Sequence, residues 1–408
     1  MAHKSRGMHP GRASVHLAAA VLLLGLLSAV HAAGAAAATC PTSWSAADQP
    51  PNPGGPSRPN ILNGVAVLSA SNAWAVGLYQ GAVADRTLTV HWNGTAWQLV
   101  PSLNPGGPNR ENSLTGVAAV SAHDIWAVGT YDNGTTDRTL IEHWNGSVWK
   151  VVPSPNLGGP SGENLLAGVV ATSASNAWAV GKYSDGPAFQ TLLEHWNGTT
   201  WKIVPSPNPG GQDVNNALTG VTAASGSDAW AVGYYFEPGA AYRTMTLHWN
   251  GTLWKLVPSP NAGTSGDDNF LNGAATTATN PAWAVGEVSD GTASRTLTEH
   301  RTSTGWTVVA SPNPATGPAD IDTLLGATAT SAGNAWAVGT YSHGGPGKTL
   351  IVRWNGAAWQ LVPSPNPGGR AGESVLLGVS ASGSCNAWAV GYYTGAAGSA
   401  RTLALHWG

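Results

Sequence analysis

The four residues Trp74-Ala75-Val76-Gly77 return six more times along the chain, and this repetition constrains the fold more than any other feature. The later copies begin at Trp126, Trp178, Trp230, Trp283, Trp336 and Trp388, so successive copies lie 52 or 53 residues apart. Self-similarity at a fixed period of this length is typical of solenoids, propellers and other repeat architectures. We therefore interpret the chain as a tandem array of seven units.

Each unit contains four short runs of strand character. A run such as Val117-Ala118-Ala119-Val120 precedes a polar turn and the Trp-Ala-Val-Gly segment, and a third run, 138–144, leads into Asn145-Gly146 and a fourth run. Asn-Gly between two such runs is a strong hairpin signal, because both central residues of a type I′ turn need positive φ. The missing helical period excludes ankyrin-like and tetratricopeptide-like arrays. The sequence predicts an all-β fold, a seven-bladed β-propeller built from four-stranded repeats of about 52 residues.

The two ends of the repeat array complement each other. The seventh unit reaches its third run at His406-Trp407, while residues 40–55 copy the end of a unit, with Trp44 at the position of Trp97. We expect the N-terminal strand, residues 40–50, to complete the last blade. Such a splice would stop a ring of neighbour contacts from opening at one seam.

The chain has two cysteines, and both fall at this seam. Cys40 opens the donated strand, and Cys385 lies in the turn between the first and second runs of the seventh unit. The first and third turns of an up-and-down blade share one face, so we predict a Cys40–Cys385 disulfide rather than two free thiols. For so long a loop the chain-entropy estimate is about 5 kcal/mol, at the upper end of what disulfides contribute.

Residues 1–38 are typical of an export signal. Lys4, Arg6 and Arg12 precede an apolar core at residues 17–30, and small residues that suit cleavage follow. The apolar core is shorter than the ~20 residues of a spanning helix, so cleavage is favoured over a retained signal anchor. We expect a secreted or extracytoplasmic protein whose propeller occupies residues 39–408.

The charge and the motifs of the sequence argue against several classes of binding partner. The chain has 18 basic and 21 acidic residues and a net charge of −3, with no basic patch and no phosphate-cradling glycine motif, which argues against nucleic acid. Zinc-type spacings and a serine nucleophile elbow are also missing from the sequence. We expect a monomer that uses no cofactor and no metal.

The Trp-Ala-Val-Gly segment and the later Asn-Gly-Thr-x-Trp hairpin together resemble bacterial secreted propellers related to the Asp-box (BNR) and photosystem II assembly-factor groups. The resemblance covers about residues 40–408. Those groups often carry Asp-Gly-Gly-x-Thr-Trp at the comparable turn, where this chain has Asn-Gly-Thr-x-Trp. The resemblance implies a propeller fold, but its members include both glycosidases and non-enzymatic assembly factors.

Candidate ligand-binding residues come from one face of the expected ring. The loops between second and third runs and the connections between blades vary in length and chemistry and share that face, where sites on rigid scaffolds usually lie. Tyrosines lead into most of these loops, and acidic residues that break the repeat lie within them. The candidates are Tyr79, Tyr131, Tyr183, Tyr235, Tyr341, Tyr393, Asp132, Asp185 and Asp290. Packing of the tyrosines between blades is an equally good interpretation.

The function expected from these features is non-catalytic recognition of a glycan or an extracellular protein through the loop-rich face. A secreted, glycosidase-like enzyme on a propeller scaffold is the alternative, and a structural cell-surface protein is a second one. No catalytic residue can be assigned, because nothing in the sequence places two carboxylates across a pocket. The recurring histidines, such as His91 and His143, are expected to be structural.

Overall fold

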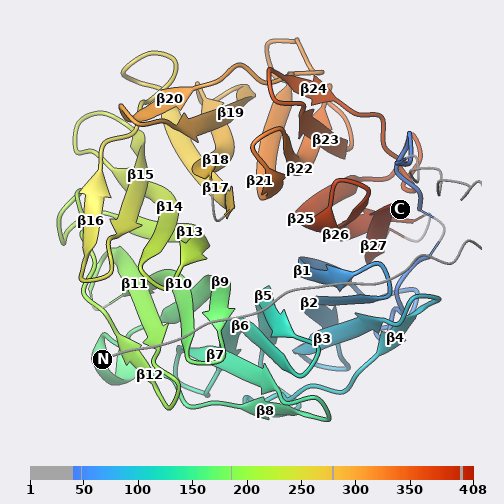
Figure 1. Cartoon of the computed structure of the whole chain (residues 1–408). Coiled ribbons are helices and arrows are strands. Elements are labelled where there is room, and N and C mark those ends of the chain that lie inside the picture. Colours follow the sequence, from blue (N-terminus) through green and yellow to red (C-terminus); the bar gives the residue numbers. More distant parts are fainter. Residues whose placement is uncertain (1–39, 47, 185, 278–279, 396–397) are drawn as a thin grey trace, which may run out of the picture. The chain divides into compact units, whose positions relative to one another are not determined.

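Each repeat of the sequence forms a small antiparallel sheet, and the sheets surround a common centre (Figure 1). This computed structural model describes residues 40–46, 48–184, 186–277, 280–395 and 398–408. The one helical element in these ranges is a 3₁₀ turn, η1 (Gly159–Ser161). Within the same ranges, no helix has the length and apolar character needed to cross a lipid bilayer.

The strands fall into four classes by their place in the sheet. The innermost strands are β1 (Asn60–Ser69), β5 (Asn112–Ser121), β9 (Asn164–Ser173), β13 (Asn216–Ser225), β17 (Asp268–Thr277), β21 (Ile321–Ser331) and β25 (Ser374–Gly383). The second strands are β2 (Asn72–Gln80), β6 (Asp124–Asp132), β10 (Asn176–Ser184), β14 (Asp228–Phe236), β18 (Asn280–Ser289), β22 (Asn334–Ser342) and β26 (Asn386–Thr394). The third strands are β3 (Asp85–Trp92), β7 (Asp137–Trp144), β11 (Phe189–Trp196), β15 (Tyr242–Trp249), β19 (Ser294–Arg301), β23 (Lys348–Trp354) and β27 (Ala400–Trp407). The outer strands are β4 (Trp97–Leu99), β8 (Trp149–Val151), β12 (Trp201–Ile203), β16 (Trp254–Val257), β20 (Trp306–Val308) and β24 (Trp359–Leu361).

The innermost strands close into a ring through a circle of glycines. Each innermost strand contacts the next, and β25 contacts β1. A Cβ placed on Gly64 would lie 3.3 Å from the Cα of Gly116, and one on Gly378 would lie 3.2 Å from the Cα of Gly64. Glycine is needed here because neighbouring backbones approach too closely for a side chain. The contact between Gly378 and Gly64 shows that the seventh sheet meets the first, which confirms the predicted propeller.

Tryptophan pairs hold each sheet to the next. The second-strand tryptophan of one sheet packs edge-on against the outer tryptophan of the following sheet, with ring centroids 5.0–5.5 Å apart. The pairs are Trp74–Trp149, Trp126–Trp201, Trp178–Trp254, Trp230–Trp306, Trp283–Trp359, Trp336–Trp44 and Trp388–Trp97. Such T-shaped contacts add stabilisation beyond that of buried area. The repeated tryptophans are therefore the principal side chains between blades.

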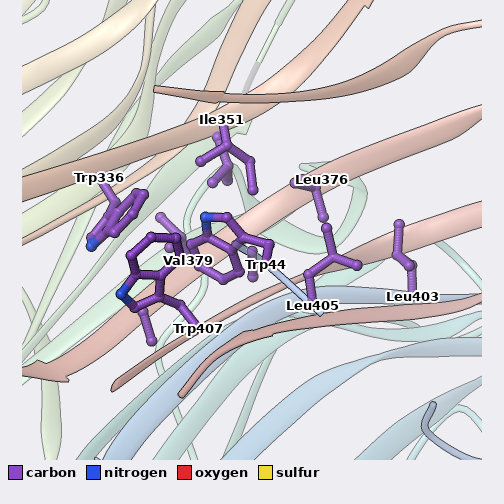
Figure 2. Close-up of a cluster of buried hydrophobic side chains, with 11 residues drawn as sticks. Trp44, Trp336, Ile351, Leu376, Val379, Leu403, Leu405 and Trp407 are labelled. Carbon is purple, nitrogen blue, oxygen red and sulfur yellow. The ribbon is translucent and has the colours of Figure 1, made fainter. Parts of the chain in front are cut away.

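Trp44 takes the place of an outer tryptophan at the seam. Its ring packs on Trp336 of the sixth sheet and on Trp407 of the seventh, among Ile351, Leu403 and Leu405 (Figure 2). This contact confirms that the N-terminal segment completes the last blade.

The pairing of the donated segment is less regular than expected. Ser45 exchanges two 2.8 Å backbone hydrogen bonds with His406, and the next contact is made by the Gln49 side chain. Its amide donates to the Ala404 carbonyl at 2.8 Å and accepts from the Ala404 N–H at 3.2 Å. A side-chain amide thus replaces a peptide group, and Ser45 pairs with His406 as an isolated bridge rather than as part of a continuous strand.

The disulfide at the seam is present. Cys40 and Cys385 are bonded, with their Cα atoms 4.7 Å apart, as the sequence predicted. The expected signal segment, residues 1–38, lies outside the described residues.

Candidate functional site

The six candidate tyrosines contact the cores between blades. Along a second strand, successive side chains point to opposite faces. In β2, Trp74 and Val76 face the following sheet, whereas Tyr79 packs with Trp388 and Val390 of the preceding one. The same packing against the preceding sheet is made by Tyr131, Tyr183, Tyr235, Tyr341 and Tyr393. This placement matches the packing alternative, and a ligand-binding role for these tyrosines stays a prediction.

The residue before each tyrosine position is the one whose chemistry changes from blade to blade. It follows the Trp-Ala-Val-Gly segment and lies on the tryptophan side of the strand, near its end. The seven residues are Leu78, Thr130, Lys182, Tyr234, Glu287, Thr340 and Tyr392, and all are half-buried. None of the seven is among the candidates predicted from the sequence, although their variation within an otherwise constant segment is a visible signal.

Three of these variable residues line one cavity. Thr130, Lys182 and Tyr234 face a space of about 410 Å³ between the second, third and fourth sheets. Glu111 and Asp137 add carboxylates to its wall. The volume lies in the range of ordinary ligand pockets. Because its wall is made of second-strand ends and first-strand beginnings, the pocket opens toward the predicted loop-rich face.

Aromatic residues that break the repeat gather in the same sector. The three phenylalanines of the chain, Phe189, Phe236 and Phe270, all lie in the third to fifth sheets, as do Tyr234 and Tyr242. The Tyr234 ring centroid is 5.0 Å from that of Phe270 and 5.4 Å from that of Tyr242. A site built on a sevenfold scaffold must use residues that differ among the repeats, and this cluster is where they concentrate.

Burial and neighbouring charge shift the pKa values of the pocket residues. Burial raises the pKa of Asp137, and the nearby carboxylates of Glu163, Asp132 and Glu111 raise it further. Burial lowers the pKa of Lys182, an effect that Glu163 opposes, and the ammonium lies 4.3 Å from the centre of the Phe189 ring. Titratable groups with perturbed pKa values in one cavity are typical of functional sites.

The acidic candidates have different surroundings. Asp132 lies across the strand pair from Asp137, so its charge acts on the pocket although it is outside the wall. Asp290 is exposed, and bonds from Ala293 and Thr292 lower its pKa to about 2, which is typical of a turn-forming carboxylate. Asp185 lies outside the described residues.

The recurring histidines support tryptophans and turns. His91 stacks on Trp74 with centroids 4.5 Å apart and bonds Asn72 at 3.0 Å, and His143 makes the equivalent contacts with Trp126 and Asp124. No group of three or more potential metal-ligating side chains occurs in the part of the chain that the structure describes.

Several solved β-propellers are similar to this chain. One is an ulvan lyase of polysaccharide lyase family PL25, with a TM-score of 0.53 and 9% identity over 89% of this chain and 94% of that one. A second is a GH74 xyloglucanase from Xanthomonas campestris, with a TM-score of 0.50 and 12% identity over 86% of this chain and 53% of that one. A third is an extracellular domain assigned to a one component system of B. thetaiotaomicron, with a TM-score of 0.50 and 10% identity over 89% of this chain and 39% of that one.

This chain spans less than two thirds of the xyloglucanase and of the B. thetaiotaomicron protein. The sequence matches no protein-family model and no curated protein. At these identities the similarity establishes a β-propeller fold and leaves the chemistry of the pocket to its own residues.

Proposed function

We propose that this protein is an extracytoplasmic recognition module that binds an uncharged glycan in the pocket between the second, third and fourth sheets. The observation that carries the proposal is the gathering of repeat-breaking aromatic and hydrogen-bonding residues in one sector of an otherwise regular ring. Tyr234, Lys182 and Asp137 are its central members.

The pocket has the mixture of surfaces that a sugar requires. A pyranose presents apolar C–H faces, which pack on aromatic rings, and hydroxyl groups, which need both donors and acceptors. Tyr234 offers a ring and a hydroxyl, Lys182 donates, and the Asp137 and Glu111 carboxylates accept. Carboxylates outnumber the single lysine in the wall, so a uronate or a sulfated sugar would be repelled.

The disulfide and one of the similar structures support a location outside the cytoplasm. The Cys40–Cys385 disulfide is of a kind that persists in oxidising compartments. We further propose that residues 1–38 direct export and are removed, with a retained anchor as the alternative. One of the similar structures is named as an extracellular domain, which supports this location, and two others are named as a xyloglucanase and a polysaccharide lyase, which supports a carbohydrate ligand.

The test is binding of the mature protein to a glycan array, followed by titration of each hit. Tyr234→Thr installs the residue found at the equivalent position in the second and sixth blades, Thr130 and Thr340, so it should preserve the fold. We expect affinity to fall at least tenfold. Tyr392→Thr changes the same repeat position in the seventh blade and is the matched control. An equal loss of affinity in both variants, or no loss in Tyr234→Thr, would show that the glycan does not bind in this pocket.

The six repeat-borne tyrosines provide a second set of variants. We retain their ligand-binding role as a separate proposal, which Tyr131→Ala and Tyr183→Ala test through affinity with melting temperature as a control.

A secreted glycosidase-like enzyme is the second candidate, and one observation favours it. The raised pKa of Asp137, beside the carboxylate of Glu111, is the pattern of a general acid paired with a charged partner. Incubation of each array hit with the protein, followed by product analysis, decides between the candidates. Turnover that is lost in Asp137→Asn but kept in Asp290→Asn would establish the enzyme and contradict the binding module. If no glycan binds at all, recognition of an extracellular protein and a structural role at the cell surface are the remaining candidates.

A further inference from the structure

A second hollow is lined by two members of the same aromatic cluster, Phe236 and Tyr242. It has a volume of about 270 Å³ and is lined by Phe236, Tyr242, Asn215 and Asp213, together with Pro187 and Ala188 of the neighbouring loop. Its wall again consists of a second-strand end, a third-strand beginning and a connection between blades. It therefore opens toward the same loop-rich face as the first pocket.

Aromatic rings form the boundary between the two hollows. Tyr234 lines the first and Tyr242 lines the second, and their rings meet edge-on with centroids 5.4 Å apart. Phe236 continues the series, 5.2 Å from Tyr242. The rings thus lead from one hollow into the other, and their spacing is comparable to the length of one sugar unit.

The second hollow also has fixed polar groups. The Asn215 amide donates to the Tyr242 hydroxyl at 3.3 Å and accepts from the Phe189 N–H at 3.0 Å, which holds the rim in place. The carboxylate of Asp213 is exposed at the edge. Aromatic surface next to hydrogen-bonding groups is the combination found in the first pocket as well.

We infer that the two hollows are consecutive subsites for one unbranched oligosaccharide, so that the ligand is a chain of several uncharged sugar units rather than a monosaccharide. This inference rests on the proposed function and specifies its ligand. One sugar unit occupies the pocket beside Tyr234, the chain crosses the edge of Tyr242, and a further unit lies against Phe236. Contacts in the second hollow then add to the affinity of the whole chain without altering that of a single unit.

The experiment is titration calorimetry with unbranched gluco-, xylo- and manno-oligosaccharides of one to six units. With the unchanged protein, affinity should rise at least tenfold between the single sugar and the longer chains. Phe236→Ser installs the residue found at the equivalent position in the third, fifth and sixth blades, Ser184, Ser289 and Ser342. We expect it to bring the longer chains down to the affinity of the single sugar, which it should leave within twofold. Asp213→Ala, at an exposed position, should weaken only the longer chains.

The matched control is Thr394→Ser, the same repeat position in the seventh blade. Affinity that does not depend on chain length, but is lost in Tyr234→Thr, would overturn the two-subsite inference and leave the proposed function standing. Absence of binding to every sugar in the series and on the array would overturn both. An equal loss for single sugars and longer chains in Phe236→Ser would also contradict separate subsites.

Discussion

Replacement of Glu194 by leucine should stabilise the protein, and the gain should depend on pH. Glu194 lies in β11 between Ala179 and Ile203 and is completely buried. Neither of its carboxyl oxygens has a hydrogen-bond partner among the described residues. Burial raises its pKa to about 8, so the folded protein holds this carboxyl in the neutral form at neutral pH.

The repeat itself shows that an apolar residue fits this position. Val90, Leu247, Val352 and Leu405 are the equivalents in four other blades, and all are completely buried. Leu405 shares its core cluster with Ile351 of the preceding sheet, and Ile141 of the second sheet belongs to the cluster beside Glu194. Glu194→Leu therefore recreates a leucine–isoleucine contact that the ring already contains.

The magnitude follows from the two pKa values. In the unfolded chain the carboxyl ionises near its ordinary pKa of 4.5, whereas the folded protein keeps the proton until about pH 8. The contribution of this glutamate to the free energy of unfolding is thus most favourable below pH 4.5. It is lost as the pH rises from there through the folded pKa of about 8. At pH 7 the penalty is about 3 kcal/mol, since each pKa unit corresponds to about 1.4 kcal/mol.

Chemical denaturation at pH 5 and pH 8 measures this effect. We expect Glu194→Leu to raise the free energy of unfolding by about 3–4 kcal/mol more at pH 8 than at pH 5, since the penalty is below about 1 kcal/mol at pH 5. Glu194→Gln should remove the same pH dependence while leaving a buried polar group, and Glu163→Gln, at an exposed position, should change little. A gain that is equal at both pH values would show that the carboxyl is not held neutral, and the reasoning from burial would fail.

Three further predictions concern the seam and the N-terminal segment. The double variant Cys40→Ser/Cys385→Ser should lower the free energy of unfolding by roughly 2–5 kcal/mol, and so should reduction of the intact protein. Denaturation with and without reductant measures this loss, and an unchanged midpoint would contradict a stabilising disulfide. Trp44→Ala should lower the free energy of unfolding by about 3–5 kcal/mol, as much as Trp359→Ala at the equivalent position in the sixth blade. If the Trp44→Ala variant melted at the same temperature as the unchanged protein, the donated segment would be dispensable. Mass spectrometry of protein exported by its own host should find a start close to residue 39, whereas an intact Lys4-containing N-terminus would favour the retained anchor.

The fold could be predicted from the sequence because the same pattern of residues occurs in every blade. Seven copies of the Trp-Ala-Val-Gly segment establish the period, and the displaced copy of an outer tryptophan, Trp44, establishes how the ring closes. The disulfide followed from the places of Cys40 and Cys385 in the unit. Each of these inferences uses residue positions within the repeat and needs no knowledge of which side chains meet across blades.

The candidate pocket could not be predicted in the same way. Tyr183 and its equivalents attract attention as aromatic residues beside variable loops, but strand alternation directs them to the preceding sheet. The neighbouring position, occupied by Lys182 or Tyr234, points to the opposite side, and whether that side is filled or open depends on how adjacent sheets diverge. Such information lies in the packing of sheets rather than in the period of the sequence.

The donated segment gives the ring an unusual order of assembly. Cys40, Trp44 and Ser45 are synthesised early, but their partners Cys385, Trp407 and His406 come more than three hundred residues later. At ordinary rates of translation the separation of 345 residues corresponds to roughly 20–70 s. During that interval Trp44 is an exposed apolar side chain on an unpaired segment, open to capture by a chaperone or by another nascent chain. Two chains that exchanged their N-terminal segments would satisfy the same contacts, so a domain-swapped dimer is the misassembly that this way of closing the ring makes available.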